Sequence, residues 1–372
     1  MRIAWIVPAP LTAISGGYGY DRAIIAGLRA AGHAVEVIEL DGRHPLADAP
    51  AEASAIAAWR GLADDAVVVI DGLALPAFAP RAALLAERRT IGLIHHPTAL
   101  EAGLAESARA MLLAAERLLF SHLARAIVTS PATARLLQAD FAVAPARIAV
   151  VVPGTDAAPR SAGSGGPGCH ILTVGSLIPR KGHDVLLRAL AMLGDLDWHL
   201  TIAGGPLDGA HGRQLAALAA TLGIAARVRF AGTVVDGALA ELWQRADIFA
   251  LATHFEGYGM AVAEALKRGV AVAITEGVPV VAVGDHTAVA QALKHGVAVA
   301  MTDGGPLAEL VPPAAGAVVA VGDHAALARA LRRMICDDEL RAEMRQAAAV
   351  AGAALPDWPT QAAAFARALT EG

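Results

Sequence analysis

Two glutamates separated by seven residues are the first candidates for chemistry in this sequence. Glu256 and Glu264 lie in the stretch THFEGYGMAVAEALKRG (253–269). The residues that directly follow the first glutamate are Gly257, Tyr258, Gly259 and Met260. A strand over FALAT (249–253) and a helix that begins near Gly259 would place Glu256 at the corner between them, beside the free amides of the helix start. A carboxylate there can accept hydrogen bonds from sugar hydroxyls.

The second glutamate would lie one to two turns inside that helix. At about 1.5 Å per residue, Glu264 would be roughly 8–10 Å from Glu256. This distance suits a sugar ring at the first carboxylate and the ribose of a nucleotide at the second. A simpler interpretation pairs Glu264 with a neighbouring arginine and makes Glu256 a helix-start charge. A glycosidase with two carboxylates is a rival, but its mechanism needs both of them at one scissile bond.

Two adjacent cations form the second candidate group. In VGSLIPRKGHD (174–184), Arg180 and Lys181 follow a predicted strand and precede a predicted helix. Two positive charges at that place suit a diphosphate. A solvated helix start is the simpler alternative. The chain uses arginine almost throughout, and its three lysines are Lys181, Lys267 and Lys294. This usage favours a specific role for Lys181.

A glycine turn and a histidine pair lie in the first half of the chain. In ISGGYGY (14–20), Gly16 and Gly17 would let backbone amides approach an anion at a helix start. The turn is not the G-x-G-x-x-G pattern of dinucleotide sites, and the chain has no P-loop. His95 and His96 end the strand-like run IGLIHH (91–96) before a proline. A lone buried histidine is usually structural, but two together before a proline at the end of a strand make a functional role as plausible as a structural one.

The elements that must position these residues follow one pattern throughout. Short β-branched runs alternate with longer Ala/Leu segments, which predicts two parallel sheets covered by helices. A stretch rich in Pro, Gly and Ser, PGTDAAPRSAGSGGPG (153–168), separates two such halves. The predicted organisation is a first domain, a linker, a second domain and a final helix, over residues 1–155, 156–168, 169–352 and 353–372. Ligands of such sheets bind at the carboxyl ends of the strands.

A repeat interrupts the second half. ALKRGVAVAITEG (265–277) matches ALKHGVAVAMTDG (292–304), and PVVAVGDH (279–286) resembles AVVAVGDH (317–324). We interpret this as an internal duplication near 265–304 that adds one strand and one helix to the second domain. The sequence leaves open which copy of the strand belongs to the sheet.

Composition excludes several classes of protein. A chain of 372 residues with 56% hydrophobic and 17% charged residues favours two folded domains. A net charge of −5 without a basic patch argues against nucleic acid. Cys169 and Cys336 have no metal-ligand spacing and are expected to be reduced thiols of a cytoplasmic protein. The late uncharged run 310–322 is too short to cross a bilayer, and the N-terminus is typical of a first strand rather than a signal peptide.

These motifs together resemble the retaining glycosyltransferases of family 4, which have the α/β GT-B fold: two Rossmann-like, doubly wound domains that face a central cleft. The resemblance extends over nearly the whole chain. The matching pieces are Gly16-Gly17, His95-His96-Pro97, VPGTD (152–156), VGSLIPRKGHDVLLRAL (174–190), TIAGGP (201–206), Glu256…Glu264 and TDGGPLAELV (302–311).

The resemblance implies metal-free and cofactor-free transfer of a hexose from a nucleoside diphosphate sugar, with retention of configuration. Arg180 and Lys181 would neutralise the leaving diphosphate. Glu256 would hold the sugar hydroxyls and Glu264 the ribose. His96, with His95 as second choice, would lie near the sugar on the acceptor side. The other implied donor-binding residues are Gly16, Gly17, Ser176, Gly257, Tyr258, Gly259 and Met260. The last helix, with Trp358, would return to the first domain.

Two departures from the family pattern stand out. Ser176 replaces a frequent arginine, which leaves Arg180 and Lys181 to supply the positive charge. The repeat follows the second glutamate directly, and only its second copy leads to Gly304, Gly305 and Glu309 of the donor loop. A displaced donor loop would leave an inactive nucleotide-binding scaffold, which is the alternative hypothesis. A sugar-nucleotide epimerase fits the residue set less well.

The sequence favours a class of sugar donor but does not identify the acceptor. We expect a UDP-sugar rather than a GDP-sugar as donor. The acceptor, a small molecule or a glycan, is not identified. The helix expected over 101–124 mixes acidic and basic residues and shows no basic face for anionic lipid, which favours a soluble acceptor.

Overall fold

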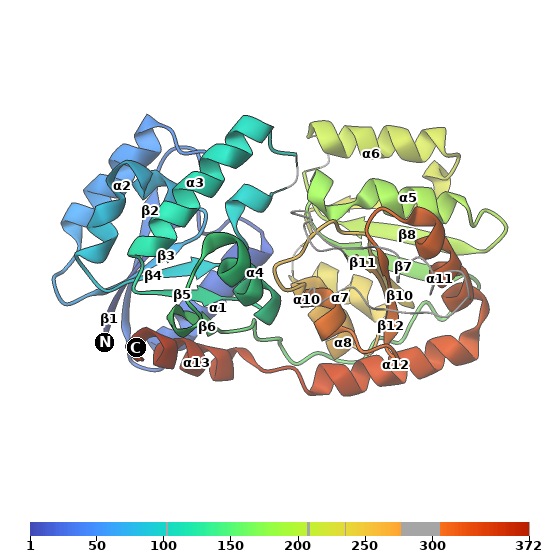
Figure 1. Cartoon of the computed structure of the whole chain (residues 1–372). Helices are drawn as coiled ribbons and strands as arrows, with labels where there is room; N and C mark the ends of the chain where they lie inside the picture. The colour runs from blue at the N-terminus through green and yellow to red at the C-terminus, as the bar shows by residue number, and fades with distance from the viewer. Residues whose placement is uncertain (102, 207–208, 235, 277–305, 372) are drawn as a thin grey trace. The chain divides into compact units, whose positions relative to one another are not determined.

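The computed structural model describes residues 1–101, 103–206, 209–234, 236–276 and 306–371 (Figure 1). The chain divides into two compact units, Met1–Gly154 with Pro356–Gly372, and Thr155–Leu355. Each unit contains a six-stranded sheet whose paired strands are all parallel. The prediction of two Rossmann-like α/β halves is confirmed. No helix within the described ranges is long and apolar enough to span a bilayer.

In the first unit the strand order is β2-β1-β3-β4-β5-β6. Its strands are β1 (Arg2–Pro8), β2 (Ala34–Leu40), β3 (Val67–Asp71), β4 (Thr90–Ile94), β5 (Arg125–Val128) and β6 (Ile148–Val150). Its helices are α1 (Gly16–Ala30), α2 (Ala49–Gly61), η1 (Leu75–Ala86), η2 (Thr98–Leu100), α3 (Glu106–His122), α4 (Pro131–Phe141), η3 (Pro145–Arg147) and α13 (Trp358–Thr370). The central strands β1, β3 and β4 are apolar along their length because helices cover the sheet.

In the second unit the strand order is β12-β11-β10-β7-β8-β9. Its strands are β7 (Cys169–Val174), β8 (Trp198–Ala203), β9 (Val228–Gly232), β10 (Ile248–Leu251), β11 (Ala271–Glu276) and β12 (Gly316–Ala320). Its helices are η4 (Pro179–Lys181), α5 (His183–Ala191), α6 (Ala210–Thr221), η5 (Ala225–Arg227), α7 (Asp236–Gln244), α8 (Met260–Lys267), α10 (Pro306–Leu310), α11 (His324–Cys336) and α12 (Asp338–Ala353). Strand β10 lies next to β7 at the centre, so the segments that follow these two strands leave the same edge of the sheet.

The first copy of the repeated strand occupies a sheet position. It forms β11, which pairs in parallel with β10 and β12. Strand β11 is filled by small and β-branched residues, and Ala271 to Ile274 are fully buried. The second copy (297–302), together with Gly304 and Gly305, lies outside the described residues. The first copy therefore fills the position between β10 and β12.

The last helix belongs to the first unit. Helix α13 packs on α1, and the Phe365 ring stacks on Trp5 of β1 with ring centroids 5.3 Å apart. Trp358 lies edge-on to Tyr20 at 5.8 Å. Arg89 donates a hydrogen bond to the carbonyl of Leu369 over 2.9 Å. The chain thus closes its first core with residues from its C-terminus.

Replacing Phe365 by alanine is expected to lower the free energy of unfolding of the first unit by about 3–5 kcal/mol, because the ring is fully buried against Trp5 and leaves a cavity. Denaturant unfolding followed by tryptophan fluorescence measures this loss. Val350→Ala, at a side chain on α12 that is 65% exposed, is the control and should change stability by less than about 0.5 kcal/mol. A loss below 1 kcal/mol for the Phe365 variant would mean that α13 contributes little to this core.

Candidate functional site

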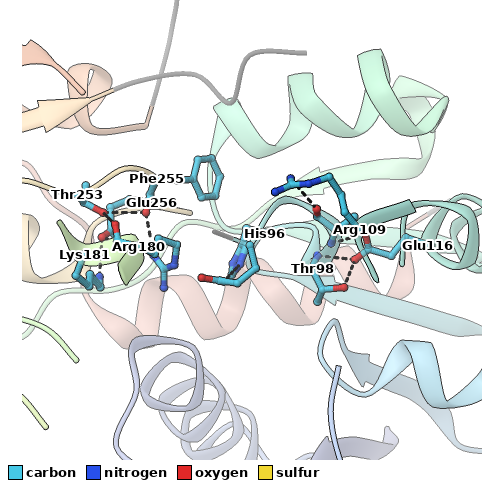
Figure 2. Close-up of polar contacts among 11 residues, drawn as sticks. His96, Thr98, Arg109, Glu116, Arg180, Lys181, Thr253, Phe255 and Glu256 are labelled. Carbon is cyan, nitrogen blue, oxygen red and sulfur yellow. Dashed lines mark hydrogen bonds and ion pairs between the residues drawn. The ribbon is translucent and has the colours of Figure 1, made fainter. Parts of the chain in front are cut away.

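Glu256 and the two cations predicted from the sequence meet at the carboxyl edge of the second sheet (Figure 2). Lys181 Nζ lies 2.6 Å from Glu256 Oε1, and Arg180 Nη1 lies 3.8 Å from the same oxygen. The three side chains are mostly shielded from solvent, with 9% of Glu256, 14% of Arg180 and 16% of Lys181 exposed. Residues 75 positions apart therefore form one compact charged group.

Electrostatics keep this carboxylate ionised. Burial by itself would raise the pKa of Glu256, but the charges of Lys181 and Arg180 and hydrogen bonds from Lys181 and Thr253 outweigh it. The net result is a pKa below the ordinary value for glutamate. The group therefore carries two positive charges and one negative charge at neutral pH. Its surplus of positive charge suits an anion.

Backbone contacts fix the corner that carries these side chains. Arg180 donates to the carbonyl of Phe255 over 2.8 Å, and the Arg180 carbonyl accepts from the amide of His254 and the hydroxyl of Thr253. Gly182 starts α5 with φ of 58°, and a Cβ there would lie 1.8 Å from the carbonyl oxygen of Ala252. Only glycine fits so close to the neighbouring chain.

The start of α8 adjoins Glu256, as the spacing predicted. Gly259 caps the helix with φ of 93°, and a Cβ at this position would lie 2.2 Å from the side chain of Leu307. Leu307 belongs to α10 and is buried. Burial raises the pKa of Tyr258 to about 12. Leu307, which follows Gly304 and Gly305 in the chain, thus packs on the start of α8, although those two glycines lie outside the described residues.

Glu264 has a different environment from Glu256. It is largely buried, and burial raises its pKa, while the charge of Arg268 and the indole of Trp243 act in the opposite direction. The Arg268 guanidinium lies over the Trp243 ring, 5.2 Å from the centroid. Arg268 Nη1 donates to the backbone carbonyl of Glu264 over 3.2 Å. A ribose-binding role for Glu264 stays a prediction.

Ser176 lies where β7 leaves the sheet. Its carbonyl oxygen lies 3.2 Å from Nε2 of His183, the first residue of α5. Burial lowers the pKa of His183 to about 4, so this imidazole is neutral. It holds the backbone at Ser176 in place and adds no charge to the cations of the site.

In the first unit, the glycine turn and one of the two histidines come together. Ser15 caps α1, and Gly16 and Gly17 form its first turn. A Cβ at Gly17 would lie 3.3 Å from Cδ2 of His95. His95 Nε2 lies 3.1 Å from Asp21 Oδ1 and 3.5 Å from Asp71 Oδ2. The sequence prediction ranked His96 first, whereas the residue at the glycine turn is His95.

His96 has another partner. Its Nε2 lies 2.9 Å from Glu101 Oε2. The loop that follows is held by the buried Glu116 of α3, which accepts from the amide and hydroxyl of Thr98 and from the amide of Ala99 over 2.6, 2.8 and 3.1 Å (Figure 2). Burial raises the pKa of Glu116 despite these bonds. Helix α3 thus anchors the segment that carries both histidines.

Asp21 and Asp71 were not predicted as site residues. A signal was present in each case, because Asp21 interrupts the apolar face of the helix after the glycine turn, and Asp71 ends an apolar strand. Within the described ranges, Asp21, Asp71 and His95 are the group of potential ligands whose atoms lie within 4.8 Å of one another. His95 Nε2 forms a hydrogen bond with Asp21 Oδ1, whereas Asp71 Oδ2 lies at ion-pair distance, 3.5 Å, without a hydrogen-bond partner.

Comparison with known proteins places the second unit in a wider context. Residues 158–284 match the family model of the glycosyl transferases group 1. D-inositol 3-phosphate glycosyltransferase of Mycolicibacterium gilvum is 39% identical over 175 residues, which is 43% of this chain and 39% of that protein. Mannosylfructose-phosphate synthase of Agrobacterium fabrum is 30% identical over 112 residues, 28% of this chain and 25% of that protein. The chain thus aligns with less than half the length of these relatives.

Solved structures match over the full length. Sucrose-phosphate synthase from Thermosynechococcus elongatus has a TM-score of 0.78 and 20% identity, over 98% of this chain and 97% of that one. Anabaena HepE in complex with UDP-glucose has a TM-score of 0.73 and 18% identity, over 100% and 99%. The fold is therefore that of the GT-B glycosyltransferases, and the family match supports a glycosyltransferase.

Proposed function

We propose that this protein is a retaining hexosyltransferase of family 4 that uses a nucleoside diphosphate sugar, a UDP-sugar rather than a GDP-sugar. The observation that carries the proposal is the group formed by Arg180, Lys181 and Glu256 beside the start of α8. The match of this segment to the glycosyl transferases group 1 and the UDP-glucose bound to the structurally similar HepE support it. The acceptor is a hydroxyl-bearing small molecule or glycan.

The charge of each residue suggests which part of the donor it would bind. Lys181 and Arg180 would bind the diphosphate and stabilise the charge that develops on it as the bond to the sugar breaks. Glu256 would accept hydrogen bonds from the sugar, and Glu264 from the ribose. The free amides at the start of α8 would add donors from Gly257, Tyr258, Gly259 and Met260. Overall, the acceptor oxygen bonds to the sugar carbon, and the nucleoside diphosphate and the acceptor proton are released.

Thermal unfolding with UDP, GDP, ADP and TDP at millimolar concentration tests the donor class. At about 100 times its dissociation constant a ligand stabilises the native state by about 2.7 kcal/mol, so we expect UDP to raise the melting temperature by about 5 °C or more. A rise in melting temperature with GDP alone would identify a GDP-sugar, and not a UDP-sugar, as the donor. No shift with any of the four would contradict a nucleoside diphosphate site.

The inactive scaffold remains the second candidate because the sequence repeat directly follows Glu264. The packing of Leu307 against Gly259 favours the active enzyme, since the end of the donor loop still reaches the start of α8. Incubation with UDP-glucose and a panel of acceptors, including D-inositol 3-phosphate, separates the two. Release of UDP that depends on the acceptor identifies an enzyme, whereas binding without any release identifies a scaffold.

A further inference from the structure

The imidazole of His95 is held from several sides by the first unit. Its Nε2 faces Asp21 of α1 at 3.1 Å and Asp71 at the end of β3 at 3.5 Å. Both carboxylates are buried, with 0% and 1% of their side chains exposed, while 19% of the His95 side chain is exposed. Two acidic groups from separate elements thus lie behind one ring nitrogen.

The remaining contacts fix the ring itself. The backbone of Gly17 lies against the Cδ2 edge, where no side chain would fit without displacing the ring. Tyr20 packs edge-on at 5.3 Å, and its hydroxyl donates to the carbonyl of Val151 over 3.0 Å. Thr129 donates to the His95 carbonyl over 3.2 Å. The ring can therefore keep one orientation, with Nε2 toward the carboxylates.

The carboxylates are anchored as well. Asp71 Oδ1 accepts from the amide of Leu73 over 2.7 Å, and Oδ2, buried without a hydrogen-bond partner, faces the imidazole nitrogen at 3.5 Å. Among the described residues, Nδ1 of His95 makes no hydrogen bond and is not one of the buried polar atoms that lack a partner. Because the ring is partly exposed, Nδ1 is the nitrogen that a substrate can reach.

We infer that Asp21 and Asp71 are positioning residues of His95: Asp21 binds Nε2–H, the charge of Asp71 lies behind the same nitrogen, and together they hold the ring with Nδ1 outward and keep it an imidazolium. This inference rests on the proposed function, in which a histidine of this segment meets the substrate. An imidazolium donates a hydrogen bond through Nδ1–H and has no free lone pair to take a proton. His95 is therefore a donor to a substrate oxygen and not the general base of the transfer.

The charges around the ring agree with this state. Burial would lower the pKa of His95, but hydrogen bonds and charge from Asp21 and Asp71 raise it to about 10. Burial raises the pKa of Asp21 to about 6, with the His95 bond acting against it. The other titratable groups that face the cluster are Tyr18 and Tyr20, whose raised pKa values keep both phenols neutral.

Nuclear magnetic resonance of the histidine rings tests the inference without any assay of activity. In protein labelled with ¹⁵N-histidine, His95→Gln identifies the signals of this ring. We expect both ring nitrogens of the parent protein to carry protons up to at least pH 8. In Asp21→Asn and Asp71→Asn, the pKa should fall toward about 6.5. Asp48→Asn, at the N-cap of α2, is the matched control and should leave the His95 titration unchanged.

Kinetics give the second readout. With a His95 pKa of about 6.5, only about one ring in thirty is protonated at pH 8, so kcat/KM of the Asp variants should fall roughly 30-fold at pH 8 and recover at pH 6. A purely structural defect would lower the rate equally at both values. A general base would show the reverse, with activity lost at low pH.

Three results would overturn the inference. The first is a neutral His95 in the parent protein at pH 7, with its signals assigned by the His95→Gln variant. The second is a rate loss in both Asp variants that does not depend on pH. The third is one equivalent of a metal ion in purified protein, released when His95 is replaced. If the chain transferred no sugar at all, the parent titration would still decide the state of His95.

Discussion

Replacing Lys181 by alanine is expected to lower kcat by about 10²- to 10³-fold, the usual effect of removing one preorganised donor to a developing negative charge. The nitrogen is held 2.6 Å from Glu256 and is mostly shielded from water. A charge in such a place interacts more strongly with a diphosphate than an exposed charge does. Arg180 remains 3.8 Å from the same carboxylate, so binding of the nucleotide should weaken less than turnover.

Steady-state kinetics and calorimetric titration with UDP separate these two effects. Lys267→Ala is the matched control. The Lys267 ammonium donates to the carbonyl of Leu355 over 3.4 Å and takes no part in the group formed by Arg180, Lys181 and Glu256. Its kcat should stay within about twofold of the parent. A Lys181 variant with undiminished kcat would remove this lysine from the diphosphate site. A loss confined to KM would mean that it binds ground and transition states equally.

The sequence predicted the parts of the site that depend on local order. The order of a buried strand, a glutamate, two glycines and a helix predicted that Glu256 lies at a corner beside the start of α8. The pair Arg180 and Lys181 between strand β7 and helix α5 followed in the same way. Because β7 and β10 are neighbours in the sheet, these two corners meet at one edge.

Other features depend on residues far apart in the chain, and sequence order could not reveal them. His95 and His96 follow strand β4, and the order of residues in the sequence does not show which of them lies at the glycine turn. Asp21 and Asp71, from two other elements, decide which nitrogen of His95 is engaged. Likewise, the two copies of the repeated strand have nearly the same sequence, so sequence alone could not show that the first copy pairs with β10 and β12.

Glu256→Gln is expected to tighten UDP binding while it lowers kcat. Lys181→Ala, in contrast, should weaken UDP binding and lower kcat. The Glu256 carboxylate neutralises part of the charge of Lys181 and Arg180, and its lowered pKa indicates that it is ionised at neutral pH. A bound diphosphate must compete with it for both cations. Removing the negative charge should therefore tighten UDP binding by up to about tenfold, or about 1.4 kcal/mol.

The same substitution should slow transfer. Glutamine is a weaker acceptor for the sugar hydroxyls than an ionised carboxylate, since charge-assisted hydrogen bonds are roughly twice as strong as neutral ones. We expect kcat with UDP-glucose to fall by about 10²-fold, comparable to the loss of other single preorganised contacts. The native state should also lose about 1–3 kcal/mol, because two shielded cations lose their partner.

Calorimetric titration with UDP, steady-state kinetics and thermal unfolding of the same preparation measure the three effects together. Glu343→Gln, at an exposed position on α12 of the same unit, controls for loss of one negative charge and should change none of them. Weaker UDP binding in the Glu256 variant would show that the carboxylate does not compete with the nucleotide. Tighter UDP binding with an unchanged kcat would mean that Glu256 competes with the diphosphate but does not hold the transferred sugar. The sugar would then bind elsewhere.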